Sequence, residues 1–258
     1  MVQWTRIGAV SGFLAVLCYS LISAAPLTLA QGLGVSCVFG PALGCASVGL
    51  YHILRLRRPT VTLDLALLAN VAAAITVTLM LLAQLGLKRW FELQFGQGST
   101  DSSERGLHAA FEAANGIQLG LDVAWDLFLV LGTVLFAWNM WHHPRFGHLL
   151  AGAGVAIAVA LIAANLAVFP QPPADAGSID LGPLIGLWYL IVTIRLATSG
   201  GWAAAQAAAD GGSRRDPPSE SGDAQPKSAK RLECACDVTT ASSAQDLDER
   251  RTADRYKL

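Results

Sequence analysis

The sequence predicts an all-α integral membrane protein, with a polytopic bundle of about six transmembrane helices over residues 1–202 and a polar, disordered cytoplasmic tail over residues 203–258. The composition points to this class, because 53% of the residues are hydrophobic and only 14% are charged, whereas about a quarter are charged in a soluble domain. The distribution of charge agrees, since charges gather in the tail and between apolar runs of about 20 residues. A helix of that length crosses a bilayer core about 30 Å thick.

The first apolar run covers about residues 7–30 and follows a single basic residue, Arg6. Its last three residues, 28–30 (TLA), resemble a signal-peptidase site, and cleavage there would reduce the number of helices to five. The run is long for a signal peptide, however. We therefore expect an uncleaved first helix.

The second and third helices are expected at residues 33–54 and 61–87. Pro41 lies inside the second helix, where a proline can kink a membrane span. Basic residues mark the exits of both helices, namely Arg55, Arg57, Arg58, Lys88 and Arg89.

A long connection at residues 91–115 follows the third helix. Asp101 and Glu104 have the spacing of a helix capping box, which favours a short amphipathic helix leading back to the membrane. Three further membrane helices are expected at residues 116–141, 149–169 and 181–198. The middle one is almost wholly small and aliphatic, which suits close packing between helices.

Lysine and arginine in short loops indicate the orientation, because these residues resist translocation. One side of the predicted bundle carries the tail and the residues Arg6, Arg55, Arg57, Arg58 and Arg145. The other side has basic residues in only one of its three connections. The sequence therefore predicts a multi-pass protein of the cell membrane with both termini cytoplasmic.

The tail is rich in small, polar and charged residues and has few large apolar ones, so it cannot bury enough surface to offset the entropy of ordering. We expect it to be disordered, with a short helix near residues 244–255. Its Cys234 and Cys236 are too few for a four-ligand zinc site. The chain has no basic stripe with interleaved aromatic residues, so no nucleic-acid partner is expected.

Polar residues inside the apolar runs are the candidate functional residues, because such residues usually face the interior of a membrane bundle. In the fourth helix, Gln118, Asp122 and Asp126 recur at spacings of four and share one helical face. A rise of 1.5 Å per residue puts Asp126 about 15 Å into this helix, near the bilayer middle, where Asn70 of the third helix is also expected. The sequence thus predicts a polar seam composed of Asp122, Asp126, Gln118, Asn70 and Trp125. In this seam Asn70 is expected to meet Asp126.

Two charged residues are expected at similar depth near the cytoplasmic ends of the third and sixth helices. These are Asp64 and Arg195, which we expect to form a structural ion pair that joins the two helices. The alternative for Arg195 is to extend its side chain to the interface.

The histidines give no sign of a buried metal or haem site. His52, His142, His143 and His148 all fall at expected cytoplasmic helix ends, and no two lie at mid-membrane. The sequence predicts no metal site and no cofactor. It also contains no His-Glu-x-x-His, Gly-x-Ser-x-Gly, Walker or Rossmann motif. An intramembrane enzyme with Asp126 as general base is therefore the least favoured class.

Four segments of the second half of the membrane region carry a resemblance to a known family: residues 119–128 (LGLDVAWDLF), 143–147 (HPRFG), 169–173 (FPQPP) and 180–190 (DLGPLIGLWYL). They resemble uncharacterised bacterial multi-pass membrane proteins that are grouped as a domain of unknown function. The resemblance implies a protein of the bacterial inner membrane. It supplies no catalytic or binding residues.

Two functional classes follow from the residues. The polar seam favours binding or permeation of a small solute or proton, with Asp126 as the main candidate. The alternative is a structural or regulatory membrane protein whose tail recruits a cytoplasmic protein partner, in which case the carboxylates serve assembly only. The lipid bilayer is a partner in both.

Overall fold

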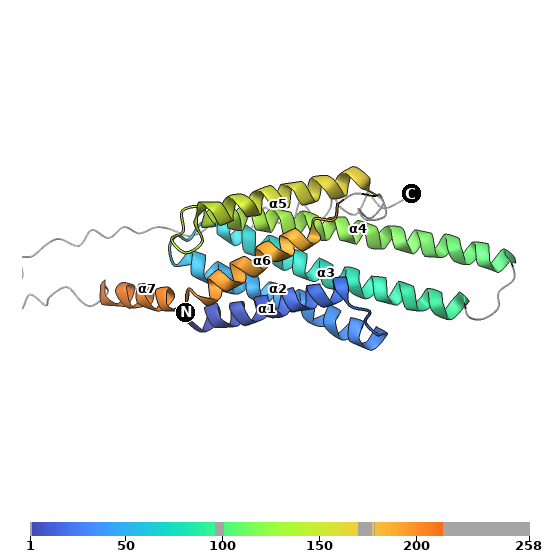
Figure 1. The fold of residues 1–258 in the computed structure, drawn as a ribbon, viewed down its shortest axis with the longest axis horizontal. Helices are drawn as coiled ribbons and strands as arrows, with labels where there is room; N and C mark the ends of the chain where they lie inside the picture. The colour runs from blue at the N-terminus through green and yellow to red at the C-terminus, as the bar shows by residue number, and fades with distance from the viewer. Residues whose placement is uncertain (1, 96–100, 170–176, 178, 214–258) are drawn as a thin grey trace, which may run out of the picture. The chain divides into compact units, whose positions relative to one another are not determined.

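The computed structural model describes residues 2–95, 101–169, 177 and 179–213. Every regular element in these residues is a helix, which confirms the all-α prediction for this part of the chain. The helices are α1 (Val2–Ala24), α2 (Leu29–Arg55), α3 (Val61–Phe95), α4 (Asp101–Met140), α5 (Gly147–Val168), α6 (Gly182–Ala197) and α7 (Gly200–Ser213) (Figure 1). The predicted disorder of the tail beyond Ser213 and its short helix at 244–255 lie outside the described residues.

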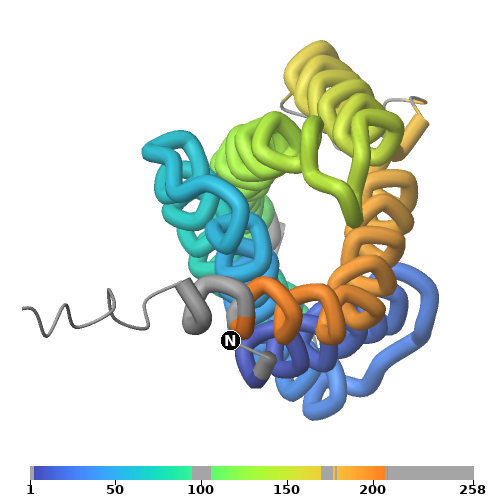
Figure 2. The backbone as a smooth tube through the Cα atoms, turned by 90° about the vertical axis from the view of Figure 1, so that its left-hand side faces the viewer, coloured from blue at the N-terminus to red at the C-terminus, as the bar shows by residue number. Residues whose placement is uncertain are grey.

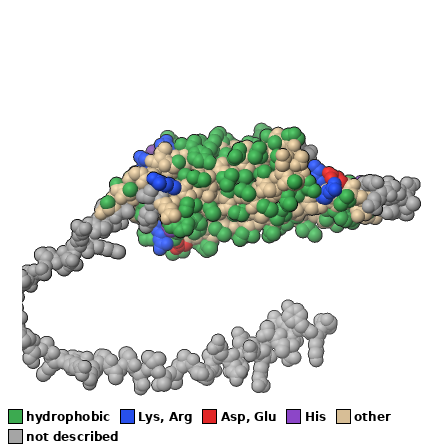
Figure 3. Space-filling view, turned by 90° about the horizontal axis from the view of Figure 1, so that it is seen from below, with side chains coloured by type: hydrophobic (Ala, Val, Ile, Leu, Met, Phe, Trp, Pro, Cys, Tyr) green, Lys and Arg blue, Asp and Glu red, His purple; other side chains and the backbone are tan. Residues whose placement is uncertain are grey.

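The length and composition of the helices fit a membrane-spanning, multi-pass protein. Helices α1 to α5 are each long and apolar enough to cross a bilayer, and α6 and α7, bent by 51° at their junction, make a sixth span if they are taken together. Large apolar side chains such as Val10, Leu68 and Leu149 are exposed. Figure 3 shows a band of hydrophobic side chains between two ends where charged side chains gather. Lipid is the solvent in which so broad an apolar surface is stable.

Six helices form a closed ring of neighbours. Helix α1 packs on α2, α2 on α3, α3 on α4, α4 on α5 and α5 on α6, and α6 returns to α1. Figure 2 shows this ring end-on. The near end in that view is called the basic end here, and it carries the residues Arg6, Arg55, Arg57, Arg58 and Arg145.

Apolar side chains fill the ring at the basic end. They form one cluster, called the basic-end cluster, whose largest members are Ile53, Leu63, Phe136, Met140, Trp188 and Leu196. A second cluster lies farther from the basic end, with Phe39, Leu43, Val77, Leu81 and Leu129 among its members. Of the seam residues, Asn70, Gln118 and Asp126 are buried in the bundle, and Asp122 and Trp125 are partly buried.

The boundary between the first two helices differs from the predicted one. Helix α1 ends at Ala24, and residues 28–30 begin α2 instead of ending the first helix. Thr28 is the N-cap of α2: its Oγ1 accepts a hydrogen bond from the backbone N–H of Gln31 at 3.4 Å, and its own N–H donates to Oε1 of Gln31 at 3.0 Å. This capping box pairs two backbone N–H groups that the start of a helix leaves without intrahelical partners.

The long connection predicted at residues 91–115 is mostly helical. Helix α3 continues to Phe95 instead of residue 87, and α4 begins at Asp101 instead of residue 116. The five residues between them, 96–100, lie outside the described part of the chain. At 1.5 Å per residue these helices are about 52 and 60 Å long, well over the bilayer core of about 30 Å. The pair therefore projects beyond the ring at the end opposite the basic end (Figure 1).

The helical region also continues past the predicted boundary at residue 202. Helix α7 reaches Ser213, so the first residues assigned to the tail are helical. Ala203 in its first turn is buried. Where α6 ends, the Ser199 hydroxyl donates to the carbonyl oxygen of Arg195 at 2.6 Å, and the chain bends into α7.

The turn between α4 and α5 buries His143, for which the sequence predicts an interface position. The side chain is only 2% exposed, and its ring packs edge-on against Trp202 of α7 with ring centroids 4.9 Å apart. Nδ1 accepts a hydrogen bond from the backbone N–H of Arg145 at 3.3 Å, so the neutral ring carries its proton on Nε2. Burial, and then the positive charges of Arg57 and Arg145, lower the pKa of His143 to about 4.

The melting temperature of the purified protein is expected to fall as the pH drops from 6.5, the ordinary pKa of histidine, toward about 4. In this window the unfolded chain binds a proton on the imidazole that the folded chain excludes, which costs at most about 1.4 kcal/mol per pH unit. Above the window both states are neutral and the stabilisation is complete. His143→Gln should flatten the pH dependence, whereas His148→Gln, at an exposed position, should not. Identical pH profiles for all three proteins would contradict the assignment.

Candidate functional site: a polar seam inside the helix ring

Helix α4 places Asp126 inside the ring. Its side chain is 3% exposed, and one carboxylate oxygen accepts a hydrogen bond from the amide of Asn165 on α5. At 1.5 Å per residue, Asp126 lies about 21 Å from the α4 terminus at the basic end. The spacing of Gln118, Asp122 and Asp126 predicts that this face of α4 points inward. The burial of Asp126 and Gln118 agrees with that prediction.

Two further carboxylates lie close enough to Asp126 to act on it electrostatically. Asp122 is one helical turn away on α4, and Asp180 precedes α6. Asp180 is exposed and accepts a hydrogen bond from the Gly182 N–H at 2.8 Å, Asp122 is partly buried, and Asp126 is buried. Among the described residues, none of the groups that act on Asp126 is basic. The three carboxylates form an acidic path that leads from the end opposite the basic end to the middle of the ring.

Asn70 is fully buried on α3, but its partner is not Asp126. The hydroxyl of Tyr189 on α6 donates to Oδ1 of Asn70 at 2.9 Å. The Tyr189 oxygen also lies 2.9 Å from Oγ1 of Thr133 on α4, and since the tyrosine proton is used, Thr133 is the donor there. Thr133 lies about 10 Å along α4 from Asp126. The seam therefore consists of the acidic path and, nearer the basic end, a hydrogen-bonded triad of Asn70, Tyr189 and Thr133.

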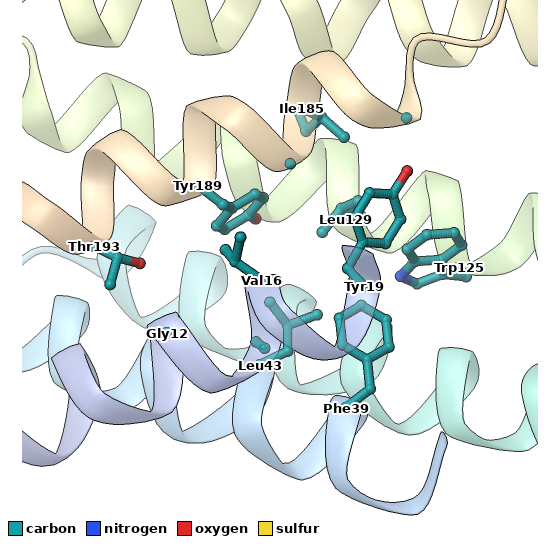
Figure 4. Close-up of a pocket in the computed structure, with 13 residues that line it drawn as sticks. Gly12, Val16, Tyr19, Phe39, Leu43, Trp125, Leu129, Ile185, Tyr189 and Thr193 are labelled. Carbon is teal, nitrogen blue, oxygen red and sulfur yellow. The ribbon is translucent and has the colours of Figure 1, made fainter. Parts of the chain in front are cut away.

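A cavity of about 50 Å³ lies between α1, α2, α4 and α6, and both Trp125 and Tyr189 line it. Most of its wall is apolar, with Tyr19 beside Trp125 (Figure 4). Nε1 of Trp125 is buried and has no hydrogen-bond partner within the described residues. Since one water needs a cavity of about 10–15 Å³ by this measure, there is room for a few water molecules but not for a larger solute.

The predicted ion pair does not form, although both of its residues are described. Asp64 accepts a hydrogen bond from the Tyr51 hydroxyl at 2.8 Å, and Nη1 of Arg55 donates to the same hydroxyl oxygen at 2.8 Å. Asp64 thus links α3 to α2, its neighbour in the ring. Arg195 is exposed on α6.

Sequence reasoning missed three partners of the seam, which are Asn165, Tyr189 and Asp180. Asn165 had a usable signal, because it is the single polar side chain of α5 after His148, and amides in membrane helices commonly form hydrogen bonds across helices. Tyr189 and Asp180 had none beyond their residue type. Within the part of the chain that is described, no three His, Cys, Asp or Glu side chains are arranged to hold a metal ion. No protein-family model, no curated protein and no solved structure matches this chain.

Proposed function

We propose that this chain is a multi-pass protein of the bacterial cell membrane, with both termini cytoplasmic, that binds protons at Asp126 and passes them along the polar seam. The observation that carries the proposal is the buried Asp126 carboxylate, whose neighbours are an amide and two further carboxylates. A buried carboxylate that has other carboxylates near it and no basic partner among the described residues keeps a negative charge only at a large cost in free energy. A proton is the smallest ligand that offsets such a charge.

The arrangement of the seam favours a proton over a larger solute. Exposure decreases from Asp180 through Asp122 to Asp126, which supports entry from the non-cytoplasmic end. The cavity that Trp125 and Tyr189 line has no room for a solute larger than a few water molecules. The hydroxyls of Tyr189 and Thr133 continue the series of exchangeable groups toward the basic end.

The basic-end cluster closes the seam on the other side. Phe136 and Met140 are buried there and, with Trp188 and Leu196, separate the triad from the basic end. Apolar side chains neither donate nor accept protons, so passage requires this cluster to separate. We therefore expect slow, gated proton movement instead of the fast conduction of an open channel.

Asp126→Asn is expected to reduce proton flux to the level of empty vesicles. The amide keeps the size of the side chain and its contact with Asn165 but does not exchange a proton at this site. The measurement records the internal pH of proteoliposomes under an imposed pH gradient, with matched protein incorporation. Asp64→Asn is the control, because it makes the same chemical change at an exposed carboxylate outside the seam, and it should keep wild-type flux.

Flux that is equal in wild type and Asp126→Asn, or absent from both while the proteins stay folded, would overturn the proposal. The alternative class would then take its place, in which the seam serves assembly and the tail recruits a partner. Deletion of residues 214–258 separates the two classes, since proton flux through the seam should survive this deletion and recruitment of a partner should not.

A further inference from the structure

A second cavity, of about 150 Å³ and lined mainly by polar side chains, opens at the basic end and shares no residue with the seam. It lies between the α2–α3 turn and the end of α4. Its polar lining consists of Arg57, Arg58, Thr60, Thr62, Asn139 and His142. Trp138 completes the wall on the outer side of α4.

Hydrogen bonds hold the floor of this cavity in place. Oγ1 of Thr60 donates to Oδ1 of Asn139 at 2.8 Å. Nδ2 of Asn139 donates to Oγ1 of Thr62 at 3.3 Å and to the carbonyl oxygen of Leu135 at 2.8 Å. The α2–α3 turn is thus attached to α4, and the site is preorganised without a ligand.

The cavity carries positive charge that no described side chain neutralises. Arg57 and Arg58 form no ion pair with any residue in the described ranges, and the ion pair that these ranges do contain, Arg89 with Glu92, lies at the opposite end. Asp64 is the acidic residue nearest to these arginines in the sequence, and its carboxylate accepts a hydrogen bond from the Tyr51 hydroxyl instead. The N-terminal end of α3 adds partial positive charge beside the arginines. An anion is therefore the chemical complement of this cavity.

The position of the cavity along the ring indicates where that anion comes from. Trp138 is 71% exposed on the apolar outer surface, two residues before α4 ends at Met140. Tryptophan gathers at the depth of the lipid headgroups, because its ring is apolar and its N–H is polar. Phosphate groups of phospholipids lie at the same depth, and basic cavities between membrane helices are suited to anionic headgroups.

We propose that this cavity binds a phosphate group at headgroup depth, held by Arg57 and Arg58 and supplied by an anionic phospholipid. Guanidinium groups match phosphate oxygens with paired N–H donors. At about 10–15 Å³ per water, as for the first cavity, the volume of about 150 Å³ has room for roughly ten water molecules, which is enough for a phosphate group but not for the two acyl chains of a lipid as well. The chains would lie outside, along the apolar surface next to Trp138. This site does not depend on the proton pathway.

The test measures binding of short-chain phosphatidylglycerol, phosphatidylcholine and inorganic phosphate to the purified full-length protein by native mass spectrometry and thermal shift. Wild type should bind phosphatidylglycerol in preference to phosphatidylcholine. The Arg57→Gln, Arg58→Gln double variant should bind phosphatidylglycerol about tenfold more weakly or worse, since two charge-assisted donors are lost. The matched control is Lys88→Gln, Arg89→Gln, which removes two charges at the opposite end and should bind as wild type does.

The ligands distinguish the sources of phosphate. Arginine-dependent binding of phosphatidylglycerol supports a lipid, and arginine-dependent binding of inorganic phosphate alone supports a phosphate site for a soluble compound. No anion binding by wild type, or equal weakening in both double variants, would overturn the site. If the glutamine variant fails to fold, Arg57→Lys, Arg58→Lys replaces it. That variant keeps the charge but loses the paired donors, and it should still bind more weakly than wild type.

Discussion

Replacement of Gly49 by leucine is expected to force α1 and α2 apart and to cost about 3 kcal/mol or more of stability, at the upper end of overpacking effects. A Cβ atom on Gly8 of α1 would lie 2.6 Å from Cα of Gly49, and one on Gly49 would lie 3.0 Å from the carbonyl oxygen of Trp4. These neighbours are backbone atoms, so no rotamer change relieves the contact. The two helices are in backbone contact here because neither Gly8 nor Gly49 has a side chain.

The measurement is the unfolding midpoint in detergent, compared with Gly34→Leu as the matched control. Gly34 lies on the same helix, and a Cβ atom there meets nothing within 4 Å. The control should therefore change stability little. Similar losses in the two variants would mean that leucine is disfavoured at glycine positions of α2 in general, and would contradict the close contact.

Trp188→Ala is expected to cost about 3–5 kcal/mol, the usual range for removing a large buried aromatic side chain. The residue is 2% exposed in the basic-end cluster, and its Nε1 donates to the carbonyl oxygen of Leu150 at 2.9 Å. Its ring lies directly on Gly154, where a Cβ atom would come within 2.6 Å of the indole. Alanine would leave an empty volume between α5 and α6 and would remove the hydrogen bond that joins the two helices.

Equilibrium unfolding of purified Trp188→Ala checks this expectation, with Trp138→Ala as the control. Trp138 is mostly exposed, so its removal takes away little packing within the protein. The two substitutions delete the same atoms, but only Trp188 is buried and hydrogen-bonded to Leu150. A loss of stability at position 138 that equals the loss at 188 would show that burial does not determine the effect.

The all-α class and the order of the apolar helices could be predicted from the sequence, because each membrane span needs an apolar run of fixed length. The number differs: about six helices are expected, and the described residues form seven, of which five are each long and apolar enough to span a bilayer. The ends of α3 and α4 could not be predicted this way. Lys88 and Arg89 predict an end of the third helix at residue 87, but a charged residue marks where a helix leaves lipid and not where it stops. The structure continues α3 through both residues, so the error follows from treating the membrane boundary as a helix boundary.

The candidate site was predictable only within one helix at a time. The spacing of Asp122 and Asp126 gives the face that α4 turns inward, and the structure buries Asp126 there. The expected depth of a residue in the bilayer is the only basis for pairing residues on different helices, and depth does not say which helices are neighbours. Asp64 and Arg195 fail as a pair because α3 packs mainly on α2 and α4, and α6 mainly on α1 and α5.

The expected contact between Asn70 and Asp126 also rests only on their similar depth in the bilayer. Its side chain lies against α4 one to two turns nearer the basic end, where a Cβ atom on Gly132 would contact the amide of Asn70. Tyr189 then reaches it from α6. Rotation of each helix about its own axis decides such contacts, and periodicity within a single helix does not fix the rotation of its partners.

Chemical modification of Asp126 in the unaltered chain tests most directly whether this carboxyl group carries the proton. Dicyclohexylcarbodiimide is apolar, reaches carboxyl groups through lipid and reacts with them when they hold a proton, and peptide mass mapping locates the product. We predict that Asp126 is modified in proteoliposomes and that proton flux falls in proportion to its modification. Complete modification of Asp126 with unchanged flux, or loss of flux with Asp126 unmodified, would contradict its role as the proton carrier.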